Sequence, residues 1–175
     1  MSRPINTPED LKGIKLRVQP SDIFLDSFSA LGANPVPMAW SEVFTAAQQG
    51  TIDGLEIPLA VIYSSKMTEV TKYLSLTNHT YNGLALLVSK QSFDRLSEAE
   101  QQRVRDAGRA AIERQRAQAT KNEEGTIAKI EATGMQVNKV DDLSKFRDRV
   151  SGIYDEYRKN IGDDVVDAAL AVVQG

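Results

Sequence analysis

Cysteine is absent from this 175-residue chain, and its only histidine is His79. The lack of cysteine excludes disulfides, thiolate catalysis and cysteine-based metal sites. A single histidine also excludes a zinc site that needs two imidazole ligands. We therefore expect neither a metal site nor a cofactor in this protein.

Long apolar runs are absent as well, because no stretch approaches the roughly 20 apolar residues that a membrane-spanning helix requires. We expect no membrane insertion. The formal net charge of −3 comes from interspersed residues of both signs and not from a basic patch, so a nucleic-acid partner is not expected. Residues 1–4 lack the pattern of a secretory signal, which leaves two hypotheses: a cytosolic protein, or a chain whose true beginning is missing.

Proline is confined to the first part of the chain, since all six prolines lie within the first 58 residues. After Lys90 the sequence is dense in charged and helix-forming residues. This shift in composition predicts two architectural halves.

The first half alternates short strand patterns with helix patterns. Ser21 and Ser41 are candidate N-caps, and Gly32 and Gly50 stand where left-handed helix ends are expected. Strands separated by short connections and helices are typical of a parallel sheet covered by helices, so the predicted class is α/β. The predicted strands are residues 14–18, 34–38 and 51–57, and a further helix is plausible over residues 59–70.

An extended pattern over residues 72–90 is too long for one ordinary strand, so we expect it to bend or to pass between two sheets. Ser97 and Glu100 have the spacing of a capping box, and the helical pattern that they open continues to about residue 132. Such a helix is roughly 50 Å long. We expect it to span two lobes or to break near Gly125. A short strand at "MQVNKV", a helix capped by Asp141 or Asp142 and a last helix follow.

Four segments together resemble the C-terminal half of a DctP-type solute-binding protein of the TRAP transporter family. They are "PINTPEDLKGIKLRV", "ALGANPVPMAWSEVFTAAQQGTIDGLEIP", "KYLSLTNHTY" and "VSKQSFDRLSEAEQQRV". The resemblance implies a two-lobed, periplasmic-binding-protein-like fold (type II-like) that is incomplete at its N-terminus. It also implies a periplasmic protein that captures a small organic acid and delivers it to a membrane permease.

The resemblance further implies a division of the chain between lobes. Residues 1–13 would end lobe one and form a linker, and residues 14–76 would form the α/β lobe two. Residues 77–92 would be a crossover strand. Residues 93–175 would supply the long helix, a short strand and C-terminal helices that complete both lobes.

Arg17 lies near the carboxyl end of the first predicted strand, where ligands of parallel sheets usually bind. Its guanidinium is a planar fork that fits a carboxylate. The alternative is a surface or edge arginine paired with Asp53 or Glu56. The resemblance favours the first interpretation, because Arg17 matches the family arginine that clamps the ligand carboxylate.

Trp40 stands where the proline-flanked segment becomes a helix. From position alone a core residue or a helix staple is the favoured interpretation, whereas the resemblance implies an aromatic wall against the ligand. Glu56 matches a family acid with a structural role, either supporting Arg17 or capping a helix. Many family members carry an asparagine in place of Ile57, so the resemblance implies a less polar acid as the ligand here.

His79 is the one side chain that ordinarily titrates near neutrality. A structural role is the usual case, but the resemblance implies a hydrogen bond from His79, and from Tyr81, to the ligand. We expect a binding protein and not an enzyme. The alternatives are a small α/β enzyme acting on a carboxylic acid, with His79 as general base and Arg17 as anchor, and an inactive truncated product.

Overall fold

A three-stranded parallel sheet forms the centre of the protein. The computed structural model describes residues 1–174, except for the side chains of residues 120, 173 and 174. The strands β1 (Lys15–Val18), β2 (Asn34–Pro37) and β3 (Gly54–Leu55) are parallel, in the order β2-β1-β3. The predicted parallel sheet is confirmed, and the two prolines of β2 lie on an edge strand because proline cannot donate to a central ladder.

Short helices surround this sheet, largely where the sequence predicts them. One boundary is wrong: α2 begins at Trp40, and Ala39 takes the N-cap position expected for Ser41. The helix expected over residues 59–70 is interrupted, since Lys66 adopts a left-handed conformation with φ of 54°. The elements are η1 (Pro8–Leu11), α1 (Asp22–Ala30), α2 (Trp40–Gln48), α3 (Leu59–Ser64) and η2 (Met67–Glu69).

A second, two-stranded sheet pairs β4 (Tyr73–Leu76) in parallel with β5 (Gln136–Lys139). Ser75 links this sheet to the beginning of the chain, since its hydroxyl donates to Asn138 at 2.8 Å and accepts from the backbone N–H of Ile5 at 2.9 Å. The extended run expected over residues 72–90 is thus a strand only at β4, and within the described residues it does not pass between two sheets. Its first residues form β4, and residues 77–89 are extended or irregular without a pairing strand.

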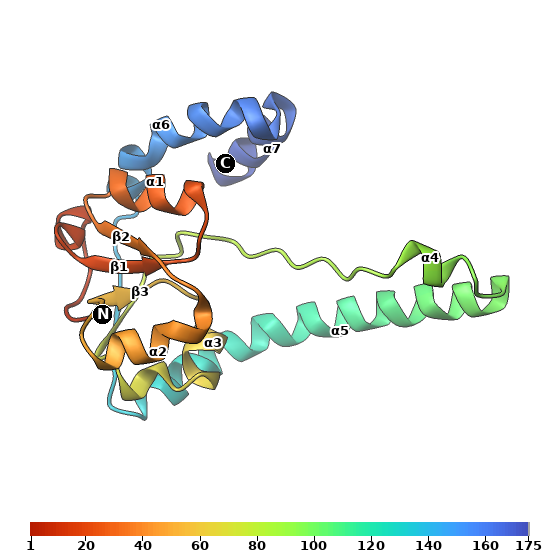
Figure 1. The fold of residues 1–175 in the computed structure, drawn as a ribbon, viewed down its shortest axis with the longest axis horizontal. Helices are drawn as coiled ribbons and strands as arrows, with labels where there is room; N and C mark the ends of the chain where they lie inside the picture. The colour runs from red at the N-terminus through yellow and green to blue at the C-terminus, as the bar shows by residue number, and fades with distance from the viewer. Residues whose placement is uncertain (175) are drawn as a thin grey trace.

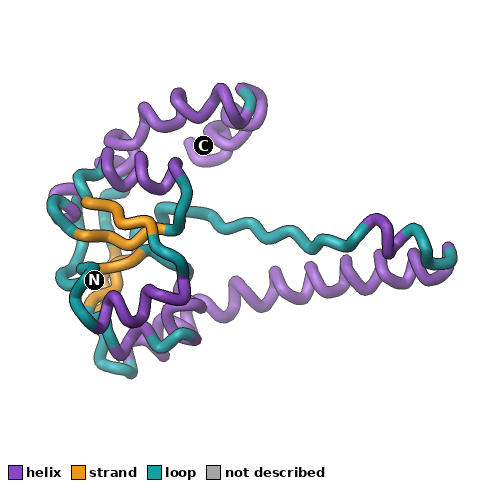
Figure 2. The backbone as a smooth tube through the Cα atoms, viewed as in Figure 1, coloured by secondary structure: helices purple, strands orange, loops and turns teal. Residues whose placement is uncertain are grey.

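The long helix α5 (Glu98–Glu131) leaves the body of the protein as an arm (Figure 1). It continues unbroken through Gly125, so the break considered there does not occur. The capping box of Ser97 and Glu100 is confirmed. In Figure 2 the chain runs outward as a loop over residues 77–89, turns through the short α4 (Lys90–Phe93) and returns along α5.

Two helices end the chain. In α6 (Ser144–Ile161), which packs against α1, the Tyr157 hydroxyl donates to Asp26 at 2.6 Å. Leu143 takes the N-cap position of α6, while the Asp142 carboxylate accepts the Ser144 N–H at 3.0 Å. The last helix is α7 (Asp163–Gln174).

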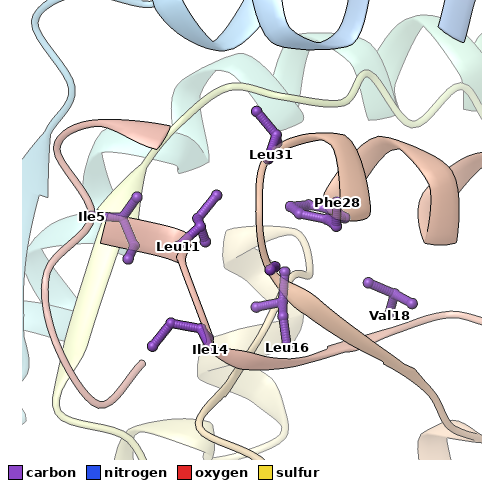
Figure 3. Close-up of a cluster of buried hydrophobic side chains, with 8 residues drawn as sticks. Ile5, Leu11, Ile14, Leu16, Val18, Phe28 and Leu31 are labelled. Atoms are coloured by element: carbon purple, nitrogen blue, oxygen red, sulfur yellow. The ribbon is translucent and has the colours of Figure 1, made fainter. Parts of the chain in front are cut away.

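Two clusters of buried apolar side chains hold these elements together. The first cluster, shown in part in Figure 3, lies between β1, α1 and the beginning of the chain. Its buried members are Ile5, Leu11, Ile14, Leu16, Val18, Phe28, Leu31 and Ala33. The second cluster joins α2, α3, β4 and the end of α5 through Val43, Ala46, Ile52, Ile62, Met67, Leu74, Ile130 and Met135. The buried Ile130 thus packs the end of α5 against the part of the protein that contains the two sheets.

Candidate functional site

Arg17 is buried near the carboxyl end of the central strand β1, as expected, with only 3% of its surface exposed. Its Nε and Nη2 both donate to the carbonyl oxygen of Met38, at 3.1 and 2.8 Å. Its Nη1 is buried and has no hydrogen-bond partner among the residues that the structure describes. Buried guanidinium nitrogens are nearly always hydrogen-bonded, so Nη1 is an unsatisfied donor that the oxygen of a ligand can pair with.

Two neighbours determine the electrostatics of Arg17. Its guanidinium carbon lies 5.5 Å from the centroid of the Trp40 ring, within the range of a cation–π contact. Burial lowers the pKa of Arg17 from its ordinary value, and the negative charge of Glu56 partly opposes that effect. Arg17 is a cation, because the guanidinium of arginine is not deprotonated in proteins.

Glu56 connects Arg17 to the only histidine. The buried Glu56 Oε2 lies 3.5 Å from His79 Nε2, and His79 Nδ1 lies 2.7 Å from the Thr77 hydroxyl. The His79 ring also meets Phe28 edge to face, with centroids 5.4 Å apart. Arg17, Glu56 and His79 therefore form one charged and polar group that starts on β1 and ends in the segment after β4.

An open cleft of about 660 Å³ lies beside this group. Glu56, Ile57, His79 and Tyr81 line it, and Tyr81 is 93% exposed. Arg17 and Trp40 are not among its lining residues, although the charge of Glu56, which lines the cleft, acts on Arg17. The predicted site residues therefore form two sets. Glu56, Ile57, His79 and Tyr81 line the cleft, whereas the buried Arg17 and its neighbour Trp40 do not.

Several polar groups at this site were not predicted from the sequence. The Met38 carbonyl could not be found because it belongs to the backbone. Thr77, which positions His79, carries no pattern of its own. The far wall of the cleft comes from α5, and the spacing of its polar residues on one helix face is a signal that could have been read. These residues are Gln115, Gln118, Asn122 and Thr126.

No group of three or more histidine, aspartate or glutamate side chains in the described part of the chain is arranged to hold a metal ion. Among the helices in that part, none combines the length and the apolarity that crossing a bilayer would demand.

Asp53 was considered as a partner of Arg17. Its carboxylate instead accepts a hydrogen bond from the backbone N–H of Lys15 at 2.8 Å.

Comparison with known proteins agrees with the fold. The structure resembles a TRAP periplasmic solute-binding protein from Bordetella bronchiseptica, whose ligand density was interpreted as pantoate, with a TM-score of 0.86 and 39% identity. It also resembles a TRAP periplasmic solute-binding protein from Polaromonas sp. JS666 bound to D-erythronate, with a TM-score of 0.87 and 38% identity. Each comparison covers 95% of this chain and 55% of the solved chain.

The sequence relationship has the same extent. A solute-binding protein of Verminephrobacter eiseniae is 38% identical over 160 residues, which are 91% of this chain and 48% of that relative. The chain therefore spans about half the length of the relatives that it matches. The family model described as bacterial extracellular solute-binding protein, family 7 (DctP), covers residues 1–160, and this chain belongs to that family.

Proposed function

We propose that this chain contributes the carboxylate-binding part of a periplasmic solute-binding protein, which captures a small organic acid and delivers it to a TRAP membrane permease. The observation that carries this proposal is the unpartnered Nη1 of the buried Arg17. Both the membership of the family and the solved relatives with bound acids support it.

The position of the Met38 carbonyl leaves one edge of the guanidinium for a ligand. Because Nε and Nη2 both donate to that single oxygen, the edge formed by Nη1 and Nη2 keeps two N–H groups for the two oxygens of a carboxylate. The contact with Trp40 holds the guanidinium plane in place, so little side-chain freedom is lost when the acid binds.

Ile57 restricts the class of acid. Its side chain lines the cleft next to Glu56 and can neither donate nor accept a hydrogen bond. A hydroxyl placed against Ile57 would lose its bonds to water without replacement, which costs about 1–3 kcal/mol. An acid with an apolar portion at this point, such as pantoate, is therefore favoured over a uniformly hydroxylated one.

The remaining predicted residues stabilise Arg17 or contact the ligand. Glu56 balances the charge of Arg17, and His79 and Tyr81 offer hydrogen bonds to the ligand from the segment after β4. The proposed lobe division is the one implied by the family resemblance, with residues 14–76 in lobe two and residues 77–92 crossing between lobes. Closure of the lobes around the acid then needs no chemical step.

The test uses a chimera in which this chain is joined to the part of the Verminephrobacter relative that it does not match. Pantoate is expected to raise the melting temperature and to change the fluorescence of Trp40, the only tryptophan of this chain. NMR of the recovered acid is expected to find it unchanged. Conversion of the acid would instead favour the enzyme with His79 as general base, and no response to any acid would refute the proposal.

A further inference from the structure

In the exposed segment after β4, an asparagine stands directly before a glycine. The chain has seven asparagines, and only Asn82 is followed by glycine, Gly83. Both residues are exposed and lie outside the helices and strands that the structure describes. The backbone nitrogen of a residue reaches the side chain of a preceding asparagine most easily when that residue is glycine, because glycine has no Cβ and a permissive backbone. The pair is therefore a candidate site of covalent modification.

No hydrogen bond holds the reacting groups of this pair in place. Neither the backbone N–H of Gly83 nor the side-chain amide of Asn82 has a hydrogen-bond partner among the described residues. Asn78 is exposed in the same segment, but it precedes His79, whose side chain hinders the approach of the backbone nitrogen. Within this segment, the chemistry thus favours Asn82.

Asparagines elsewhere in the chain are less able to react. Asn34 precedes a proline, which has no N–H. Asn122 and Asn160 lie within helices, where the next backbone N–H is bonded to a carbonyl oxygen of the preceding turn. The side chains of Asn6 and Asn138 are hydrogen-bonded to each other at 2.9 Å.

We propose that Asn82 is a site of spontaneous deamidation and that the carboxylate formed there weakens binding of the acid. Hydroxide removes the proton of the Gly83 N–H, and the nitrogen attacks Cγ of Asn82. A C–N bond forms, and the side-chain nitrogen takes a proton from water and leaves as ammonia. The cyclic succinimide then adds one water molecule, which opens one or the other of its ring C–N bonds. The product is aspartate or isoaspartate, and each carries one more negative charge than asparagine.

The position of Asn82 gives this charge a consequence. Asn82 lines the open cleft, in which Glu56 and Glu123 already place carboxylates. A further carboxylate on the same wall repels an anionic ligand. This step rests on the proposed function, because it takes the cleft to receive the acid. Conversion of Asn82 would therefore lower the affinity of the protein as it ages.

The modification is measured on the chain without any ligand. The purified chain is incubated in mildly alkaline buffer, where more of the backbone amide is deprotonated, and peptides are mapped by mass spectrometry. We expect the peptide with Asn82 to be converted before any other asparagine peptide, and to give both aspartate and isoaspartate. Conversion that is faster at another asparagine, or absent at Asn82, would overturn the proposal.

Gly83→Ala is the matched control for the reaction. A Cβ at Gly83 would lie 3.6 Å from Cε1 of Tyr81, which is an ordinary contact, and Gly83 does not have a positive φ. The variant is therefore expected to keep the circular dichroism of the chain and to slow the conversion of Asn82. An equal rate in the variant would show that the Gly83 nitrogen is not the attacking group.

The effect on binding is measured by isothermal titration of the Verminephrobacter chimera with pantoate. Asn82→Asp is expected to weaken binding by roughly two- to fivefold at low salt, as expected for one added charge near the ligand in water. Asn160→Asp adds the same charge at an exposed position of α6 outside the cleft and is expected to have no effect. Equal affinities of the two variants would refute the effect on binding. A chimera that binds no acid would refute the proposed function, whereas peptide mapping would still decide the modification.

Discussion

The guanidinium of Arg17 and the indole ring of Trp40 lie 5.5 Å apart across the point where β2 leads into α2. Arg17 comes from the central strand, whereas Trp40 is the first residue of a helix that begins three residues after the neighbouring strand ends. The sheet thus brings together a cation and an aromatic ring that are 23 positions apart in the sequence. In the proposed site this contact would hold Arg17 in place, whose buried Nη1 has no hydrogen-bond partner among the residues that the structure describes.

Arg17→Lys is expected to weaken acid binding by the Verminephrobacter chimera at least about tenfold, because an ammonium cannot give the two parallel hydrogen bonds of the fork. The fold is expected to persist, since a lysine can still donate to the Met38 carbonyl. Isothermal titration with pantoate and thermal unfolding measure the two effects. An unchanged affinity would remove Arg17 from the binding site.

Glu56→Gln is expected to lower the free energy of unfolding by about 1–3 kcal/mol, since the variant leaves the buried Arg17 without its compensating charge. Urea unfolding of the chain measures this change. Glu113→Gln, which removes an exposed carboxylate from the middle of α5, is the control and is expected to shift the free energy by less than about 0.5 kcal/mol. Equal effects of the two variants would show that Glu56 does not stabilise Arg17.

Ile57→Asn is expected to improve binding of D-erythronate relative to pantoate in the chimera, because the new amide can pair with a ligand hydroxyl. Ile57→Leu keeps an apolar side chain of equal size and is expected to retain the original preference. The ratio of the two dissociation constants is the measured quantity. A ratio that stays constant in both variants would mean that Ile57 does not contact the acid.

Tyr157 makes the stability of the α1–α6 contact dependent on pH. The hydrogen bond to Asp26 raises the pKa of Tyr157 to about 12, above its ordinary value near 10. The folded state therefore holds its proton where the unfolded state has lost it, so this contribution is complete below pH 10 and declines as the pH rises towards 12. Urea unfolding between these pH values measures the decline.

Tyr157→Phe is expected to flatten that pH dependence relative to the unmodified chain. Tyr154→Phe removes a hydroxyl from the same helix and is expected to leave the dependence in place. If the slopes of all three proteins agree, the hydrogen bond to Asp26 does not control stability.

Gly125→Ala is expected to stabilise the chain by about 1 kcal/mol, because alanine favours a helix over glycine by that amount. The site has room, since a Cβ at Gly125 would meet no atom within 4 Å. Gly134→Ala also meets open space, but Gly134 has φ of 91°, which disfavours any side chain. Its expected effect is a loss of about 1–2 kcal/mol. Thermal unfolding measures the change in stability of both variants. If both changes have the same sign, backbone conformation does not decide the effect of alanine at these two positions.

Local signals determine most of the secondary structure of this chain. The capping box at Ser97, the glycines with left-handed backbone at Gly32 and Gly50, and the prolines of the edge strand act within a few residues and were predictable. The first residue of α2 and the interruption at Lys66 were not, because packing against the second apolar cluster overrides weak local preferences.

The sequence by itself determined the class of fold, the order of its elements and the candidate residues Arg17, Trp40 and His79, since periodicity, capping and family resemblance are all properties of the linear chain. Only the tertiary structure decided that Glu56 stands between Arg17 and His79 and that Met38 occupies one edge of the guanidinium. It also decided that polar residues of α5 close the cleft. These relationships depend on how two sheets and a long helix pack, and no short-range pattern encodes a distance between segments so far apart.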